Sequence, residues 1–399
     1  MFMTHFSRRL INMAESETLA MARLSRELKA QGKDIINLSL GEPDFDTPDY
    51  IKHAAKDAID QNFSHYTPVA GYDELLDAIC LKLKRDNQLD FKRSQILVST
   101  GAKQCIANLV MACIDDGDEV IVPAPYWVSY REIIKMAGGK PVEILAGIDK
   151  DFKVTAEMVE QAITPKTRML MFSSPCNPTG SVYNHTELQD IVNVLAKHPD
   201  IIVVSDEIYE LINFVGKHIS IGTFDAIKDR TVTINGLSKA FAMTGWRLGY
   251  LAAPEDIAKA SIKMQGQFTS ATCSITQRAA IVALTNGPEK VEGMVAAFKK
   301  RKELAHQLLL DIPNIVVNNP QGAFYFFPDV SYYMGKTAGS YTIKNSDDLS
   351  MYLIHEANVS TVPGSAFGAE NYIRLSYATS EDAIAKAIER IKTALMNLK

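Results

Sequence analysis

Short apolar runs alternate with longer amphipathic stretches between about residues 75 and 285. Seven of these runs have the length of β-strands, and several are continuous rather than alternating, which is typical of strands covered on both faces. They lie at residues 96–99, 120–122, 141–145, 169–173, 201–205, 231–235 and 249–252. This alternation predicts a three-layer α/β domain, with helices on both faces of a mostly parallel seven-stranded sheet.

The stretches between these runs have helical periodicity. Residues 104–114 carry one apolar stripe that ends at an Asp-Asp-Gly turn, as expected for a helix packed on a sheet. Residues 186–197 begin with Thr186 and carry Gln189 three positions later, which predicts a capping box at the start of that helix.

The pattern changes from about residue 289. A long charged helix (289–310) is followed by a strand signal (322–327), a helix (347–357), a strand (372–377) and a terminal helix. This order indicates a smaller α+β domain, and a chain of 399 residues is long enough for two domains. We therefore expect an N-terminal arm and helix at residues 1–45 that pack with the small domain, a large domain at 46–288 and a small domain at 289–399.

Composition narrows the class of protein. A formal charge of −5 and a pI of about 6.0 give no reason to expect a nucleic-acid partner. The most apolar long window, residues 96–114, is interrupted by Lys103, Gln104 and Asn108, so we expect no membrane span. The five cysteines have neither C-x-x-C pairing nor metal-ligand spacing. We therefore expect a cytoplasmic protein without a metal site.

In an open parallel sheet, ligands bind beyond the carboxyl ends of the strands, so the residues that follow each strand are candidates. Gly101, Ala102 and Lys103 follow the first run and begin a helix, whose free N–H groups suit a phosphate. Asn177 follows the fourth run and precedes Pro178. That pair either makes an ordinary turn or presents the amide at the sheet edge.

Charged residues follow two further strands. Asp206 either caps a turn or needs a cationic partner, such as a protonated pyridine nitrogen, and Tyr209 lies three residues later. Lys239 follows the next strand, where a partly desolvated amine can act as a nucleophile. Arg247 is a candidate phosphate anchor. Together these groups suit pyridoxal 5′-phosphate, which has an aldehyde, a phosphate, a phenolic oxygen and a basic ring nitrogen.

Six segments resemble the class I aminotransferases of the aspartate aminotransferase superfamily, which are fold type I pyridoxal-phosphate enzymes, and most of all the prokaryotic-type aspartate aminotransferases. The segments are residues 41–48, 125–130, 177–180, 205–209, 238–247 and 374–377. The resemblance runs in order from about residue 7 to the end of the chain. It implies two half-reactions with ping-pong kinetics, in which an amino acid leaves as a 2-oxo acid and a second 2-oxo acid receives the amino group.

The resemblance also implies a role for each matching residue around the cofactor ring. Lys239 would hold the cofactor as a Schiff base and would then move the Cα proton of the substrate. Asp206 would keep the ring nitrogen protonated. Asn177 and Tyr209 would hydrogen-bond the phenolic oxygen, and Trp127 would stack on the ring.

At the cofactor phosphate and the substrate, further residues match the family. The phosphate would meet the Gly101, Ala102 and Lys103 turn, Ser238, Arg247 and, from the second subunit of a homodimer, Tyr66. Arg374 would bind the substrate α-carboxylate, and Gly41 would leave room for it. No histidine matches a catalytic position, and we expect the eight histidines to be structural.

The preferred amino acid is less well defined by the sequence. Lys103, Ser16 and Thr18 match positions that bind the side-chain carboxylate in aspartate-specific members, so we expect aspartate and 2-oxoglutarate as substrates. The alternatives in the same family are prephenate, aromatic, alanine and methionine aminotransferases. Two other classes remain: a pyridoxal-phosphate lyase, which would not leave pyridoxamine phosphate, and a ligand-sensing domain of a transcription factor, which would need an added DNA-binding domain.

Overall fold

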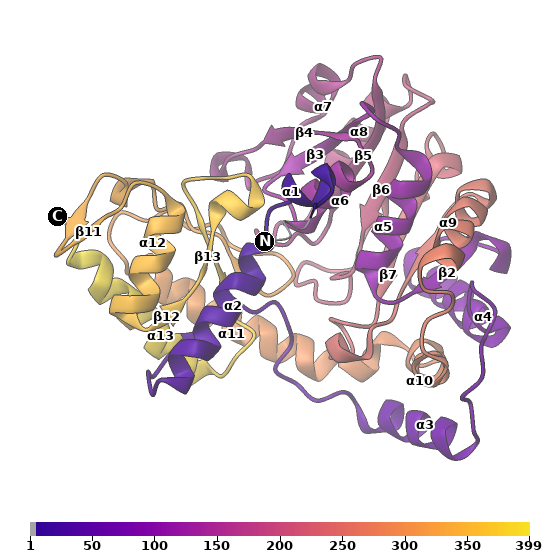
Figure 1. Cartoon of the computed structure of the whole chain (residues 1–399), viewed down its shortest axis with the longest axis horizontal. Helices are drawn as coiled ribbons and strands as arrows, with labels where there is room; N and C mark the ends of the chain where they lie inside the picture. Colours follow the sequence, from indigo (N-terminus) through magenta and orange to yellow (C-terminus); the bar gives the residue numbers. More distant parts are fainter. Residues whose placement is uncertain (1–4) are drawn as a thin grey trace.

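The computed structural model describes residues 5–399, and its larger part is built around one seven-stranded sheet (Figure 1). The strand order is β2-β8-β7-β6-β5-β3-β4, and of these strands only β8 runs antiparallel to its neighbours. The predicted mostly parallel sheet is therefore confirmed. The strands are β2 (Ile96–Ser99), β3 (Glu119–Ala124), β4 (Lys140–Leu145), β5 (Thr167–Ser173), β6 (Ile202–Asp206), β7 (Thr231–Gly236) and β8 (Gly249–Ala252).

Helices cover both faces of this sheet, which confirms the three layers. On β2, Leu97 packs into one apolar cluster, whereas Ile96 and Val98 pack into another on the opposite face. Such burial on both faces explains the continuous apolar runs. The edge strand β4 is the partly exposed exception. The helices are α3 (Asp49–Asp60), α4 (Asp73–Lys82), α5 (Ala102–Cys113), α6 (Ser129–Met136), α7 (Ala156–Ala162), α8 (His185–Leu195), α9 (Glu255–Phe268) and α10 (Ser274–Thr285).

The capping box predicted at Thr186 and Gln189 is wrong. Helix α8 is capped by Asn184, whose side chain accepts from the Glu187 backbone N–H at 3.0 Å, while the Glu187 carboxylate accepts from the Asn184 N–H at 2.8 Å. Asn is at least as good an N-cap as Thr, and the Asn184–Glu187 pair has the same spacing. Thr186 therefore lies inside the first helical turn.

The C-terminal part has its own apolar core, in which helices α11 and α13 pack on short strands. Strand β14 lies between β13 and β9, and β1 pairs with β12. The elements are α11 (Glu292–Leu310), β9 (Tyr325–Phe326), β10 (Thr337–Ala338), β11 (Tyr341–Thr342), α12 (Ser346–Tyr352), β12 (Val359–Ser360), β13 (Val362–Pro363), β14 (Ile373–Ser376) and α13 (Glu381–Met396).

Most of the N-terminal segment lies beside this C-terminal part, whereas its first helix lies against α6 of the larger part (Figure 1). The segment contains α1 (Arg8–Ile11), α2 (Glu17–Ala30) and β1 (Ile36–Asn37). Met21 of α2 packs with Ile35 and Ile354, as expected for a helix that belongs with the small domain. The boundaries near residues 45 and 288 stay predictions. Within residues 5–399, no helix is both long and apolar enough to cross a bilayer.

Candidate functional site

The largest concentration of predicted site residues lies at the carboxyl ends of β5, β6 and β7. These three strands are parallel neighbours, and their register pairs Ser173 with Asp206 and Asp206 with Ile234. The loops that follow them therefore open at one edge of the sheet. They line a cavity of about 240 Å³ together with residues from α2, α5 and the C-terminal part. The predicted site residues in its wall are Ser16, Thr18, Gly41, Ala102, Lys103, Trp127, Asn177, Asp206, Tyr209, Ser238, Lys239, Arg247 and Arg374.

Lys239 enters the cavity from the loop after β7. Its Nζ donates to the Gly41 carbonyl oxygen and lies 5.8 Å from the centre of the Tyr209 ring. Burial and the positive charge of Arg374 lower the pKa of this amine to about 8. A considerable fraction of Lys239 is therefore neutral near physiological pH, as a nucleophile or a base requires.

Asp206 ends β6 and faces the same cavity, with only 5% of its surface exposed. One carboxylate oxygen accepts from the Tyr130 hydroxyl at 2.7 Å, and the other accepts from the Ile208 N–H at 3.2 Å. Burial raises the pKa of Asp206 to about 6 in spite of these two donors. A cation in the cavity would stabilise the ionised carboxylate, so the position favours a positively charged ligand atom.

The other polar side chains are held by the C-terminal part. The Tyr209 hydroxyl lies 2.7 Å from that of Tyr325, and burial raises the pKa of Tyr209 well above its usual value. The Asn177 amide oxygen accepts from Arg374 at 3.0 Å. Trp127 packs edge-on against Tyr130, with ring centres 5.4 Å apart, and lines the cavity wall.

The start of α5 forms a compact turn against Arg247. Gly101 has φ +85°, and a Cβ on it would lie 2.4 Å from an Arg247 guanidinium nitrogen. A Cβ on Gly249, the first residue of β8, would lie 2.3 Å from the Ala102 nitrogen. Both positions therefore require glycine. Because the first N–H groups of a helix lack acceptors within it, those of Ala102 and Lys103 suit an anion beside Arg247.

Arg374 of β14 is a buried cation, with 2% of its surface exposed. It donates to the Ser39 carbonyl at 2.6 Å and to Asn177, and it lies between the Tyr325 and Phe367 rings. Its Nε is buried without a hydrogen-bond partner, and no carboxylate among residues 5–399 forms an ion pair with this guanidinium. A buried charge of this kind is costly unless a ligand carboxylate compensates it.

A second cation and two hydroxyls lie on the α2 side of the cavity. Lys103 Nζ is 5.0 Å from the Trp127 ring centre, and burial, followed by the charge of Arg247, lowers its pKa. Ser16 is the N-cap residue of α2 but makes no capping hydrogen bond with its side chain. The Thr18 hydroxyl is buried without a partner. These groups can therefore bind a second anionic group of a ligand.

Two predicted residues do not line this cavity. Gly101 packs against Arg247, which does line it, whereas the side chain of Tyr66 is 98% exposed. Conversely, Tyr130 and Tyr325, which hydrogen-bond Asp206 and Tyr209, were not among the residues predicted from the sequence. Tyr130 lies on the buried face of the amphipathic helix α6, and Tyr325 lies in an apolar run that is typical of a core strand. No local signal distinguishes either tyrosine from an ordinary core residue.

Comparisons with known proteins agree with this geometry. A model of the family described as aminotransferase class I and II matches residues 33–391. The chain is 47% identical over 403 residues to the probable aspartate/prephenate aminotransferase of Rickettsia bellii, covering 99% of this chain and 100% of that protein. It is 43% identical over 400 residues to the aspartate/prephenate aminotransferase of Cereibacter sphaeroides, covering 98% of each.

Solved structures are similar over the whole chain. The aspartate aminotransferase from Rhizobium meliloti superposes with a TM-score of 0.95 at 40% identity, covering 99% of this chain and 100% of that one. The aspartate aminotransferase from Thermus thermophilus with maleate gives a TM-score of 0.91 at 39% identity, covering 98% and 100%. The resemblance stated from the sequence motifs is thereby confirmed, as is the prediction of an enzyme. The chain belongs to the class I and II aminotransferases.

Proposed function

We propose that this aminotransferase uses pyridoxal 5′-phosphate and transfers the amino group of aspartate to 2-oxoglutarate. The observation that carries the proposal is the meeting of three groups in one cavity: the amine of Lys239, the buried carboxylate of Asp206 and the buried guanidinium of Arg374. A lysine, a carboxylate for a ring nitrogen and a cation for a substrate carboxylate are the groups that this cofactor chemistry needs.

The residues of the cavity fit the cofactor. When bound, pyridoxal phosphate supplies an aldehyde that condenses with amines and a ring that withdraws electrons from the amino-acid Cα. Asp206 would pair with the ring nitrogen, and Asn177 and Tyr209 would hydrogen-bond the phenolic oxygen. The ring of Trp127 would stack on the cofactor. The phosphate would be bound by the start of α5 with Ser238 and Arg247.

Two residues would act on the substrate. Arg374 would bind the α-carboxylate with both arms of its guanidinium, and so orient the Cα–H bond. Lys239 would accept the proton from the substrate Cα and would then donate it to the cofactor. Its lowered pKa of about 8 supports this role, because a general base works best when its pKa lies near the working pH.

A dicarboxylic substrate is favoured by the α2 side of the cavity. Lys103 supplies a cation, and the unpaired hydroxyls of Ser16 and Thr18 supply donors. Aspartate and 2-oxoglutarate both carry a second carboxylate, as does the maleate in the Thermus thermophilus structure. Prephenate is the second candidate, because it is also a dicarboxylic 2-oxo acid and both curated relatives are named for it.

The substrate proposal predicts a change of selectivity when Lys103 is replaced by Met. Truncating one partner of a buried charge pair costs about 2–5 kcal/mol, and the Lys103 side chain is exposed in the ligand-free protein. We therefore expect an approximately 30-fold loss with aspartate, from the lower part of that range, and little loss with alanine or methionine. The measurement is a panel of half-reactions, followed by cofactor absorbance, with aspartate, glutamate, alanine, methionine and phenylalanine as donors and prephenate as acceptor.

The matched control is Lys197→Met, which removes a surface lysine paired with Glu160. A dicarboxylic site would be refuted if the natural protein reacted equally fast with aspartate and alanine and if Lys103→Met changed neither rate. A lyase would give no pyridoxamine phosphate in the same assay.

We further propose a homodimer in which Tyr66 reaches the phosphate of the other subunit, because this tyrosine is 98% exposed and does not line the cavity of its own chain. Mixing Lys239→Ala subunits with Tyr66→Ala subunits should raise activity above that of either variant, since each mixed dimer then contains one intact site. A Tyr332→Ala variant is the exposed-tyrosine control. No gain on mixing would contradict a shared site.

The five free cysteines support the proposal that the enzyme works in a reducing compartment, such as the cytoplasm.

A further inference from the structure

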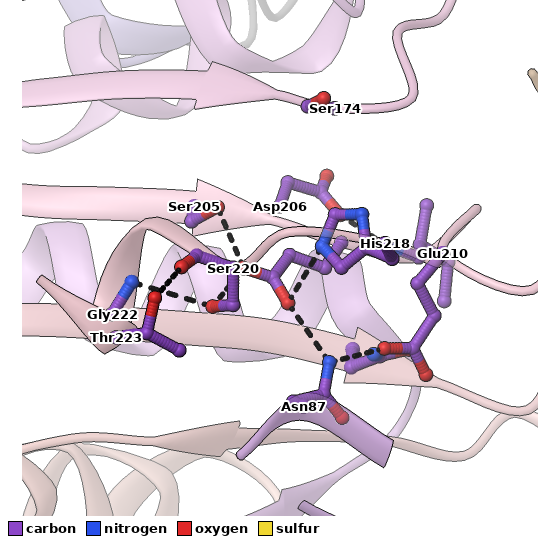
Figure 2. Close-up of polar contacts among 12 residues, drawn as sticks. Asn87, Ser174, Ser205, Asp206, Glu210, His218, Ser220, Gly222 and Thr223 are labelled. Carbon is purple, nitrogen blue, oxygen red and sulfur yellow. Dashed lines mark hydrogen bonds and ion pairs between the residues drawn. The ribbon is translucent and has the colours of Figure 1, made fainter. Parts of the chain in front are cut away.

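A buried group of charged side chains lies next to Asp206 of the candidate cofactor site (Figure 2). Its centre is Glu207, the residue after Asp206, which has no exposed surface. One Glu207 oxygen accepts from the Ser205 and Ser220 hydroxyls at 3.0 and 2.6 Å. The other lies 3.1 Å from the His218 imidazole and 3.3 Å from the Asn87 amide nitrogen.

A second ion pair continues this group away from the cavity. The Asn87 amide nitrogen also donates to Glu210 at 2.6 Å, while its oxygen accepts from Lys82 at 2.7 Å. Lys82 and Glu210 form a direct, buried salt bridge. The group thus holds two carboxylates, one lysine and one histidine, and none of the four lines the cavity. Tyr250 and Arg85 are further titratable side chains on which the charge of these carboxylates acts.

Such a group is costly, because buried ion pairs often stabilise a fold less than apolar side chains of the same size. The pairing of opposite charges within the group offsets this cost. Burial alone would lower the pKa of His218, but the negative charge of Glu207, whose oxygen lies 3.1 Å from His218 Nε2, outweighs burial and raises it. In turn, His218 holds the pKa of Glu207 below its usual value despite complete burial. Each of the two groups therefore favours the charged form of the other.

We propose that Glu207 and His218 are positioning residues that act as a matched pair of opposite charges behind Asp206, and so determine how firmly Asp206 holds a cation in the cavity. The inference rests on the proposed function, in which that cation is the cofactor ring nitrogen. Glu207 is adjacent to Asp206 along the chain, and its negative charge favours a proton on Asp206. The other charged or titratable groups around Asp206 are Tyr130, Lys239, Tyr209, Cys105 and Cys176.

Two substitutions, each made alone and each replacing a charged side chain by a neutral one, should shift the pKa of Asp206 in opposite directions. Glu207→Gln removes the nearby negative charge, so Asp206 should lose its proton at a lower pH. His218→Gln leaves Glu207 uncompensated but still ionised, because Ser205, Ser220 and Asn87 continue to donate to it. Asp206 should then keep its proton to a higher pH. At an effective dielectric constant of about 20, a unit charge changes a proton affinity by roughly a hundredfold at about 6 Å and roughly tenfold at about 12 Å.

Two spectroscopic readouts test these signs on the full chain. The first is the pH dependence of the Asp206 carboxyl ¹³C signal in ligand-free protein, assigned by its loss in Asp206→Asn. The second is the pH at which the ring nitrogen of ¹⁵N-labelled pyridoxal phosphate loses its proton in the holoenzyme. Both midpoints should fall in Glu207→Gln and rise in His218→Gln. In the double variant, both should match Glu207→Gln, because His218 acts through Glu207.

The matched control is Glu119→Gln, which removes a carboxylate of low exposure that is paired with Lys140. Glu119 is the first residue of β3, at the end of the sheet away from the cavity. This substitution should change thermal stability without moving either midpoint. Shifts of the same sign in the two single variants, or none, would overturn the inference and leave the group a packing element. Failure of the natural protein to bind pyridoxal phosphate would instead refute the proposed function, and the ligand-free measurement would still decide the inference.

Discussion

Replacing Lys239 with alanine is expected to lower the transamination rate by at least about 10⁴-fold, the upper end of what general acid–base catalysis contributes. The side chain carries the amine nearest to Asp206 in the cavity, and no other lysine except Lys103 lines it. The absorbance of the lysine-bound cofactor should disappear as well. In the natural protein, covalent attachment should become faster as pH rises through about 8, because the neutral fraction of Lys239 grows over that range.

The control for this prediction is Lys259→Ala, which removes an exposed lysine of α9 paired with Glu255. It should keep both the rate and the absorbance. Thermal unfolding of Lys239→Ala should match that of the ligand-free natural protein, since the lost amine makes one hydrogen bond, to the Gly41 carbonyl. Normal cofactor absorbance in Lys239→Ala would refute the assignment of Lys239 as the residue that binds the cofactor covalently.

The cofactor side of the site is largely predictable from the sequence. Asn177, Asp206 and Lys239 each follow an apolar strand, and the carboxyl ends of parallel strands share an edge. Because the three strands are adjacent and in register, the predicted loops do meet. The turn at Gly101 meets them only because β8 lies between β2 and β7. The order of strands in a sheet cannot be predicted from the local hydrophobic periodicity of the sequence.

The residues that support the site could not be predicted in the same way. Tyr130 begins α6 and contacts Asp206 only after that helix packs on the sheet. His218 lies in an irregular loop, where a histidine carries no signal of an ion pair with a buried glutamate. Asn87 closes a single π-helical turn after α4, which no pattern of apolar residues indicates. Tertiary packing therefore determines these contacts.

Replacing Arg374 with lysine is expected to lower kcat/KM for amino acids by about 10²–10³-fold. Arg374 spans from the Ser39 carbonyl to the Asn177 amide and lies between two aromatic rings. A lysine ammonium cannot bridge both acceptors and also bind a carboxylate with two parallel hydrogen bonds. Losing one partner of a buried charge pair costs about 3–5 kcal/mol, and the retained positive charge reduces that loss.

The loss should fall mainly on KM for both the amino acid and the 2-oxo acid, because Arg374 binds the carboxylate that the two have in common. An amine without an α-carboxylate should react with the cofactor about as fast in the variant as in the natural protein. Since Arg374 is buried, retained cofactor absorbance and an unchanged unfolding temperature are needed to show an intact fold. The partly exposed Arg168, on β5, provides the Arg→Lys control. An unchanged KM in a folded Arg374→Lys variant would mean that the substrate carboxylate binds elsewhere, and the buried guanidinium would then need another anion.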